Sequence, residues 1–327
     1  MIKPLLVLLL STLLSLTANA ADTAVKALSP QRLAINGGLA TVGLSKDWKT
    51  PQPNTRRAVI VIHGRLRNAQ TYLRSAERAA YRSGYRSTTL LIAPQFLDRK
   101  DIVKHQLPDS ILRWHKDDWM EGDAAIGPVP VSSFTVIDEI LTKLSDRKLF
   151  PALQEVVIAG HSGGAQVVQR YVLIGKGGAA LEKAGVTLRY VVANPSSYAY
   201  FDAQRPGPVD KASCPGFDTW KYGMNKLPPY AGKQTVEQIE QNYVKRDVTY
   251  LLGQLDTDID HPALDRTCAA EAQGAYRLIR GHNFFNYLQQ RHPEGLNQRL
   301  IEVPGVGHDG DAIFTSPEGQ AALFRPQ

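Results

Sequence analysis

Cysteine is scarce in this sequence, whose 327 residues include only Cys214 and Cys268. Neither cysteine lies in a C-x-x-C pair or beside a histidine, so the usual spacing of a structural zinc site is absent. Two cysteines in an exported chain form one disulfide by default. The sequence therefore predicts a Cys214–Cys268 disulfide if the chain is exported.

Long apolar runs are also absent, apart from one at the N-terminus. Residues 1–20 carry one cation, Lys3, then an apolar run over 5–16, and they end in an A-x-A cleavage pattern at 18–20. The run is short for a membrane span, which needs roughly 20 residues. We therefore expect a cleaved signal peptide, a secreted or periplasmic chain without a stable membrane anchor, and a single domain over 21–327.

The sequence has no basic tract with interleaved aromatic residues, which is the pattern typical of nucleic-acid binding. Its formal net charge is +7, but the cations are spread along the chain. We therefore expect no nucleic-acid partner, while a mild preference for anionic surfaces or substrates stays open. Hydrophobic residues make up 43% of the sequence and charged residues 21%, which is ordinary for a globular protein.

Strand-like and helix-like segments alternate along the chain. Continuous β-branched and apolar runs predict strands that are buried on both faces, as in parallel sheets. We expect strands at 58–62, 87–96 (broken by Pro94), 153–160, 187–195, 247–256 and from 299 onward, and helices at 68–84, 132–149, 165–178, 265–280, 283–290 and 316–324. This alternation predicts an α/β fold with a mostly parallel central sheet and helices on both faces.

Two long excursions interrupt this alternation, at about 98–130 and 196–246. Both follow predicted strands, and both carry aromatic residues, among them Trp114, Trp119 and Tyr200. Because loops on a rigid scaffold commonly set specificity, one hypothesis is that the excursions form a lid or an acyl pocket. The alternative is that their aromatic residues form the ordinary core of a small cap.

A glycine-rich motif, Gly160–Gly164 (GHSGG), stands between a predicted strand and a predicted helix. A serine on such a tight turn projects its hydroxyl above the edge of the sheet, and the turn needs very small neighbours. The N–H of Gly163, at the start of the helix, can bind an oxyanion. We interpret Ser162 as a nucleophile and Gly163 as an oxyanion donor; the alternative is a structural turn.

A nucleophilic serine needs a general base and an acid that orients the base. Of the eight histidines, His308 lies in a glycine-rich loop just past the last predicted strand, at the same sheet edge as Ser162. Asp256 ends the fifth predicted strand and is the expected acid, with Asp258 as the alternative. The acids here are spaced as in a calcium loop, but the glycine and glutamate that such a loop needs are absent.

The order Ser162, Asp256, His308, together with the Gly160–Gly164 motif and an early strand that ends in His-Gly, resembles the α/β-hydrolase superfamily. The likeness covers about residues 58–324 and implies the α/β-hydrolase fold with the two excursions as cap or lid segments. Within the superfamily, the chain is similar to exported bacterial esterases, lipases and polyhydroxyalkanoate depolymerase-like proteins.

The resemblance places the second oxyanion donor in the loop after His63, at the backbone N–H of Arg65. This loop reads HGRLRN instead of the HGGG of many lipases and esterases. We expect His63 to brace the loop rather than to react. Arg65 and Arg67 either hold an anionic group of the substrate or are solvated surface residues, and the sequence leaves both interpretations open.

Together these inferences predict a serine hydrolase that cleaves carboxylic esters through an acyl-enzyme. The expected partner is a small-molecule or polymeric ester substrate, and no metal ion or organic cofactor is implied. Two alternatives stay open, namely a peptidase or amidase of the same fold and a noncatalytic binding protein on a hydrolase scaffold.

Overall fold

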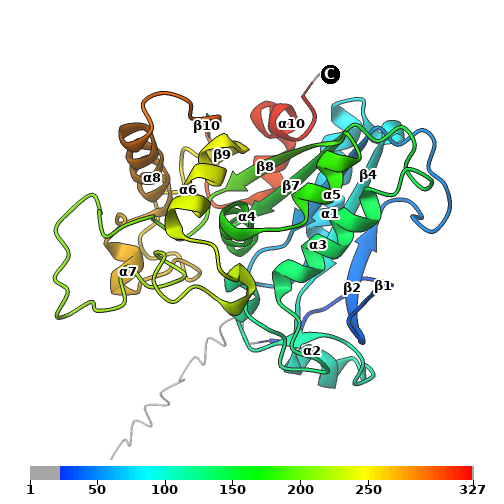
Figure 1. Cartoon of the computed structure of the whole chain (residues 1–327), viewed down its shortest axis with the longest axis horizontal. Coiled ribbons are helices and arrows are strands. Elements are labelled where there is room, and N and C mark those ends of the chain that lie inside the picture. Colours follow the sequence, from blue (N-terminus) through cyan, green and yellow to red (C-terminus); the bar gives the residue numbers. More distant parts are fainter. Residues whose placement is uncertain (1–22, 326–327) are drawn as a thin grey trace, which may run out of the picture.

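The computed structural model describes residues 23–325, so the predicted signal peptide at 1–20 lies outside the described residues. Within the described range the centre is an eight-stranded sheet in the order β1-β2-β4-β3-β7-β8-β9-β10 (Figure 1). Its strands are β1 (Gln31–Ile35), β2 (Gly38–Leu44), β3 (Arg57–Ile62), β4 (Thr89–Gln95), β7 (Glu155–His161), β8 (Thr187–Ala193), β9 (Asp247–Gly253) and β10 (Gln298–Val303). All strands from β4 to β10 in this order run parallel, which confirms the predicted sheet.

Helices cover both faces of the sheet. Along β3, Ile60 and Ile62 point into one apolar core, whereas Val59 and Val61 point into a second core on the opposite face. The first core packs against α3 (Ser133–Leu144), α4 (Gly163–Ile174), α5 (Gly178–Lys183), α6 (Val236–Lys245) and α8 (Arg277–Arg291). The second packs against α1 (Ala69–Arg82), α9 (Gly310–Thr315) and α10 (Pro317–Leu323). This alternation explains why the strand is apolar at every position after Arg57.

The edge of the sheet differs from the sequence-based expectation. The hairpin of β1 and β2 is antiparallel and was not predicted, because β1 is only partly buried and carries no continuous apolar run. Pro94 does not break its strand. The parallel register of β4 with β3 ends at Ile92, and the strand then continues through Pro94 in antiparallel pairing with β2.

The helices near the C-terminus also differ. In place of helices at 265–280 and 283–290, a short α7 (Cys268–Glu271) is followed by α8, which runs without interruption. Gly281 does not end this helix. A Cβ there would lie 2.4 Å from a side-chain carbon of Leu252, so the glycine lets α8 approach the sheet closely. The helix α9 was not predicted.

The first excursion folds into short elements beneath the sheet edge: β5 (Leu97–Asp98), α2 (Arg99–Lys104), β6 (Arg113–Trp114) and a 3₁₀ turn over Asp118–Glu121. Trp114 and Trp119 are fully buried, and Trp119 stacks on Phe96 with ring centroids 5.3 Å apart. In the second excursion, Tyr198 and Tyr200 pack on Phe284 of α8. These aromatic residues therefore form ordinary core.

The predicted disulfide is present between Cys214 and Cys268. It joins the second excursion to the first residue of α7 across a sequence separation of 54 residues. The bridge lies in a small apolar cluster with Phe217 and Tyr222. The excursion is therefore attached to the segment that follows Asp256.

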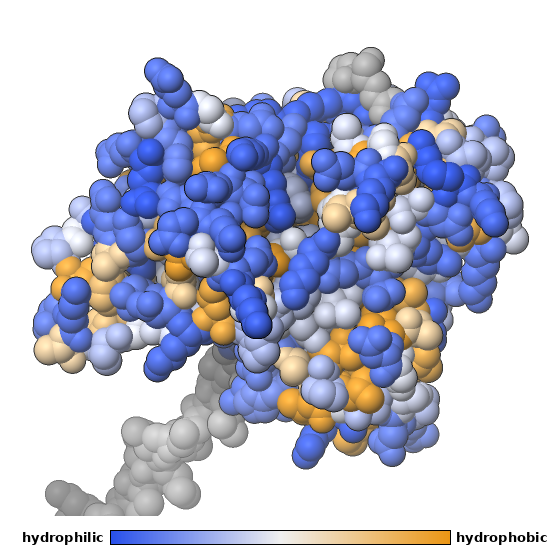
Figure 2. Space-filling model, viewed as in Figure 1, coloured by the Kyte–Doolittle hydropathy of each residue, from blue (hydrophilic) through white to orange (hydrophobic). Residues whose placement is uncertain are grey.

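No helix among residues 23–325 is long and apolar enough to cross a membrane. On the face of the molecule in Figure 2, hydrophilic residues cover most of the surface, and apolar residues appear in separate patches. Large sets of apolar residues are buried in the two cores that flank the sheet.

Candidate active site

Ser162 occupies the tight turn between β7 and α4, where its backbone has a φ of 59° and a ψ of −121°. A positive φ is uncommon for a residue with a side chain, and the surrounding structure must hold it in place. A Cβ at Gly160 would lie 2.2 Å from the carbonyl oxygen of Gly164, and a Cβ at Gly164 would lie 2.3 Å from that of Ile62. Only glycine fits either position, because strand, turn and helix touch through their backbones there.

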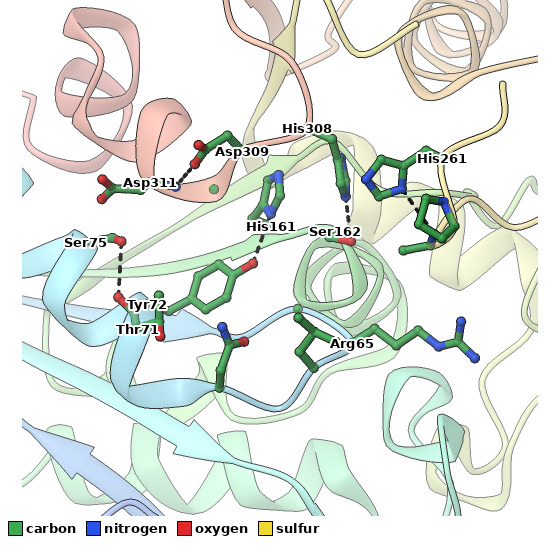
Figure 3. Close-up of a pocket in the computed structure, with 16 residues that line it drawn as sticks. Arg65, Thr71, Tyr72, Ser75, His161, Ser162, His261, His308, Asp309 and Asp311 are labelled. Carbon is green, nitrogen blue, oxygen red and sulfur yellow. Dashed lines mark hydrogen bonds between the residues drawn. The ribbon is translucent and has the colours of Figure 1, made fainter. Parts of the chain in front are cut away.

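The structure brings Ser162, His308 and Asp256 into one hydrogen-bonded row. Figure 3 shows the Ser162–His308 part of this row. His308 Nδ1 lies 2.7 Å from Asp256 Oδ2, and His308 Nε2 lies 3.0 Å from Ser162 Oγ. Because the carboxylate accepts the Nδ1 proton, Nε2 is left to accept the serine hydroxyl proton. Asp258 is exposed, and its carboxylate accepts a hydrogen bond from the N–H of Asp260 instead.

Parallel strands explain how residues so distant in sequence meet. Ser162 directly follows β7, Asp256 lies just beyond the end of β9, and His308 lies in the loop after β10. The carboxyl ends of these strands lie at the same edge of the sheet. The site is thus built at the ends of β7, β9 and β10, and β8 lies between β7 and β9 in the sheet.

Two further imidazoles flank His308, and the sequence did not single them out. The ring of His161 lies 4.6 Å from that of His308, and the ring of His261 lies 4.8 Å away on the other side (Figure 3). Burial lowers the pKa of His161 well below 6.5, and its Nδ1 lies 3.0 Å from the hydroxyl of Tyr72. His261 Nδ1 accepts the N–H of Ala263, so this ring is also neutral when so bonded.

Arg277 is a buried cation behind the acid, and no sequence signal distinguishes it from other helical arginines. Its side chain is 1% exposed. The guanidinium lies 3.3 Å from Asp256 Oδ1, donates to Ser196 Oγ and lies 3.3 Å from His261 Nδ1. Burial lowers the pKa of His308, the bond to Asp256 opposes this shift, and the charge of Arg277 reinforces it.

The backbone N–H groups of Gly163 and Arg65 lie close together beside Ser162. A Cβ on Gly163 would stand 3.1 Å from the Arg65 nitrogen. Within residues 23–325, neither N–H donates a hydrogen bond to a protein acceptor. Two adjacent, unused donors next to a serine hydroxyl form a suitable site for an oxyanion.

His63 braces the loop that carries Arg65. Its Nε2 accepts the N–H of Phe96 at 3.0 Å, and its Nδ1 lies 2.9 Å from the carbonyl oxygen of Gly64. The ring is fully buried against Trp119, and burial lowers the pKa of His63 to about 4. His63 is therefore neutral and fully engaged in hydrogen bonds, as a structural residue should be.

The two arginines of this loop point in different directions. Arg65 is partly exposed beside the pocket, and its Nε lies 2.7 Å from Asp117 Oδ2. Arg67 is 2% exposed and forms ion pairs with Asp98 and Asp101. Both sequence-based interpretations of Arg67, as an anion binder or a solvated surface residue, are therefore wrong, because its charge is already compensated inside the protein.

A pocket of about 930 Å³ opens above Ser162. Its walls come from residues 64–66, from 71–75 of α1, from 261–263 and from 308–311. The excursions contribute none of these lining residues. Their aromatic residues therefore do not form the predicted acyl pocket, because they are used in the core beneath and beside it.

Among residues 23–325, no group of three or more histidine, cysteine or acidic side chains is arranged to hold a metal ion. The row from Asp256 to Ser162 can move a proton from the Ser162 hydroxyl to the His308 imidazole.

No protein-family model matches the chain, and no curated protein matches its sequence. Solved structures do match. Poly(aspartic acid) hydrolase-1 from Sphingomonas sp. KT-1 is 20% identical, with a TM-score of 0.59 over 90% of this chain and 98% of that chain. The poly(3-hydroxybutyrate) depolymerase from Bordetella parapertussis is 19% identical, with a TM-score of 0.59 over 88% of this chain and 84% of that chain. The chain has the α/β-hydrolase fold.

The α/β-hydrolase fold agrees with the site geometry described above. In this fold a nucleophile stands on a strained turn between a strand and a helix, followed in sequence by an acid and a histidine. Ser162, Asp256 and His308 have this order and lie at the corresponding sheet edge. Identities near 20% establish the fold, whereas the activity must be argued from the site itself.

Proposed function

We propose that this protein is an exported serine hydrolase that cleaves carboxylic esters, with Ser162 as nucleophile, His308 as general base and Asp256 as the orienting acid. The observation that carries the proposal is the continuous row from Asp256 Oδ2 through His308 to Ser162 Oγ, with distances of 2.7 and 3.0 Å. A structural turn needs neither the base nor the unused N–H donors beside it.

The steps follow from these positions. His308 Nε2 accepts the hydroxyl proton as Ser162 Oγ attacks the acyl carbon, and the N–H groups of Gly163 and Arg65 hold the oxyanion. The bond to the alcohol oxygen then breaks, and His308 returns the proton to that oxygen. Water, deprotonated by His308, hydrolyses the acyl-enzyme and regenerates Ser162.

The predicted signal peptide at 1–20 and the disulfide support secretion or a periplasmic location for the mature domain over 21–327. The open pocket supports either a small ester or a segment of a polymeric ester as substrate. One protein of the same fold is a poly(aspartic acid) hydrolase, so the substrate panel should include amides as well as esters.

Fluorophosphonate labelling tests the proposal directly. The wild-type chain should take up one label at Ser162, and Ser162→Ala should take up none. Ser75→Ala is the matched control, because Ser75 lines the same pocket but does not contact the triad, and it should label normally. An unlabelled wild-type chain would show that the protein is not a serine hydrolase and would favour a noncatalytic binding protein.

Short-chain, long-chain and polymeric esters, together with aminoacyl anilides, then define the substrate. Faster cleavage of anilides than of matched esters would reject the ester assignment in favour of a peptidase or amidase. Because both reactions use the same triad, Ser162→Ala must abolish whichever activity is found.

A further inference from the structure

The loop after β3 has a defined turn geometry. The N–H of Arg67 donates to the carbonyl oxygen of Gly64 at 3.0 Å, so residues 64–67 form a β-turn. Arg65 and Leu66 are its central residues. The Arg65 N–H is not used by the turn bond and lies next to Ser162, so the position of the turn decides where this donor points.

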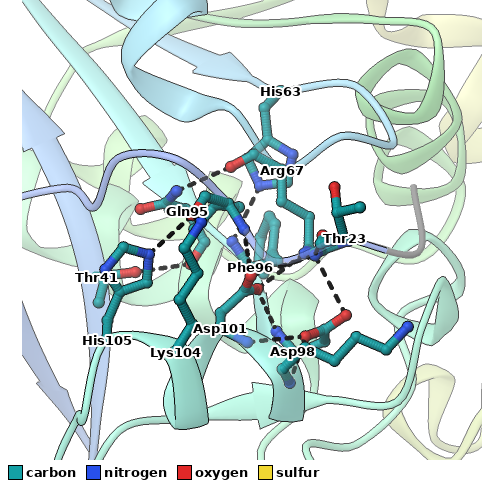
Figure 4. A network of polar contacts seen from close by, with 12 residues as sticks. Thr23, Thr41, His63, Arg67, Gln95, Phe96, Asp98, Asp101, Lys104 and His105 are labelled. Carbon is teal, nitrogen blue, oxygen red and sulfur yellow. Dashed lines mark hydrogen bonds and ion pairs between the residues drawn. The ribbon is translucent and has the colours of Figure 1, made fainter. Parts of the chain in front are cut away.

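The side chain of Arg67 points toward Asp98 and Asp101 (Figure 4) and does not line the pocket. Its Nε lies 2.9 Å from Asp101 Oδ2, and its Nη2 lies 3.2 Å from Asp101 Oδ1 and 3.2 Å from Asp98 Oδ2. The three side chains are at most 7% exposed. A planar guanidinium held by two buried carboxylates has little freedom to move.

The N-terminal segment 23–29 adds to the same network. The carbonyl oxygen of Thr23 accepts a hydrogen bond from Arg67 Nη2 at 2.9 Å. The N–H of Val25 donates to Asp101 Oδ1 at 2.7 Å. The first residues of the described chain thus contact the cation and one of its carboxylates.

Gln95, at the end of β4, holds the backbone of the loop. Its side-chain amide donates to the carbonyl oxygens of Arg67, at 2.8 Å, and of Ala27, at 3.0 Å, and its Oε1 accepts the N–H of Ser29. The backbone of Arg67 has a φ of 57°, an uncommon conformation that needs such support. Both the side chain and the carbonyl of Arg67 are therefore held from behind the pocket.

We propose that Arg67, with Asp98 and Asp101, is a positioning group that fixes the 64–67 turn so that the Arg65 N–H meets the oxyanion. The inference rests on the proposed function, because it assigns a role within that reaction. Arg67 touches no substrate. It acts through the turn that it closes. In the HGRLRN loop, the buried ion pairs of Arg67 give this turn the rigidity that it needs.

The test replaces Arg67 with lysine, which keeps the charge but loses the planar fork. An interaction made only in the transition state changes kcat and kcat/KM equally and leaves KM unchanged. Losing an oxyanion donor outright costs about 10²- to 10³-fold, so a displaced donor should lower kcat by about 10- to 100-fold, with KM within about twofold. Affinity for an alkylboronic acid that adds to Ser162 should fall with kcat.

The matched control is Arg57→Lys. Arg57 begins β3, the same strand that leads into the turn, and it is also 2% exposed and paired with a buried carboxylate, that of Glu155. It lies at the opposite end of the strand from Ser162. Well below its unfolding temperature, Arg57→Lys should keep the wild-type kcat even if it loses as much stability as Arg67→Lys.

Asp98→Asn covers the case in which Arg67→Lys does not fold. Asparagine can still cap α2, as the carboxylate of Asp98 does, but it removes one charge contact to Arg67. It should lower kcat about threefold to tenfold at unchanged KM. Folded Arg67→Lys and Asp98→Asn variants with the wild-type kcat would overturn the positioning role, whereas an inactive wild-type chain would overturn the proposed function instead.

Discussion

Replacing Gly164 with alanine should damage the site through the backbone rather than through any catalytic group. The new Cβ would stand 2.3 Å from the carbonyl oxygen of Ile62 and 2.6 Å from that of His63. Cβ atoms essentially never approach other atoms within 3.0 Å, so β3 and α4 would have to separate by about 0.7 Å in a tightly packed region. Neither backbone can relieve the overlap by rotating a side chain.

This displacement acts on the two parts of the proposed oxyanion site. Ile62 and His63 lead directly into the turn with Arg65, whereas Gly164 lies in the first turn of α4 beside Gly163. A misplacement near 1 Å can lower turnover about 100-fold, and overpacking costs about 1–3 kcal/mol of stability. We therefore expect kcat for an aryl acetate to fall about 100-fold and the melting temperature to fall by several degrees.

The assay pairs steady-state hydrolysis with thermal unfolding followed by circular dichroism. Gly178→Ala is the control, because its Cβ would meet only a side-chain carbon of Leu188 at an ordinary 3.4 Å. Gly178→Ala should leave kcat and the melting temperature unchanged. A Gly164→Ala variant with kcat within about twofold of wild type and an unchanged melting temperature would refute the steric reasoning.

Three further predictions follow from the site and the disulfide. Asp256→Asn should lower kcat for ester hydrolysis about 10⁴-fold, whereas Asp258→Asn, at an exposed position, should change kcat less than twofold. A larger loss of kcat for Asp258→Asn would make Asp258 the acid that orients His308. Because burial lowers the pKa of His308 and only the neutral ring accepts a proton, kcat/KM should fall with decreasing pH at a midpoint below 6.5; a midpoint above 6.5 would contradict this environment. Replacing both Cys214 and Cys268 with serine should lower the free energy of unfolding, measured with urea, by about 4 kcal/mol, which is the chain-entropy value for a loop of this size. An unchanged free energy of unfolding would contradict this account.

Three of the strands that the sequence predicted share one property. β3, β7 and β9 are buried on both faces, so nearly every residue in them is apolar and the run is visible without knowledge of the partners. The β1–β2 hairpin lies at an edge and is partly exposed, so it leaves no such run. The continuity of α8 through Gly281 depends on a close contact with Leu252, which no local pattern records.

The candidate site divides in the same way. The sequence singled out Ser162 because glycines on both sides of a serine have a local steric reason, namely the tight turn. It singled out His308 and Asp256 because parallel strands bring their carboxyl ends to one edge of the sheet. Arg277, His161 and His261 carried no such signal, since their importance arises only from their proximity to His308 and Asp256.

The sequence by itself determined the layer architecture, the disulfide pairing and the turn that holds Ser162, because each depends on local patterns or on the only available partner. Only the tertiary structure decided the burial and the charge partners of Arg67. A buried and an exposed arginine look the same in a sequence, and only the folded chain shows that Asp98 and Asp101 meet this one behind the turn. Arg67 and Asp101 are 34 residues apart in sequence, and the burial of their ion pair is set by packing that no single segment encodes.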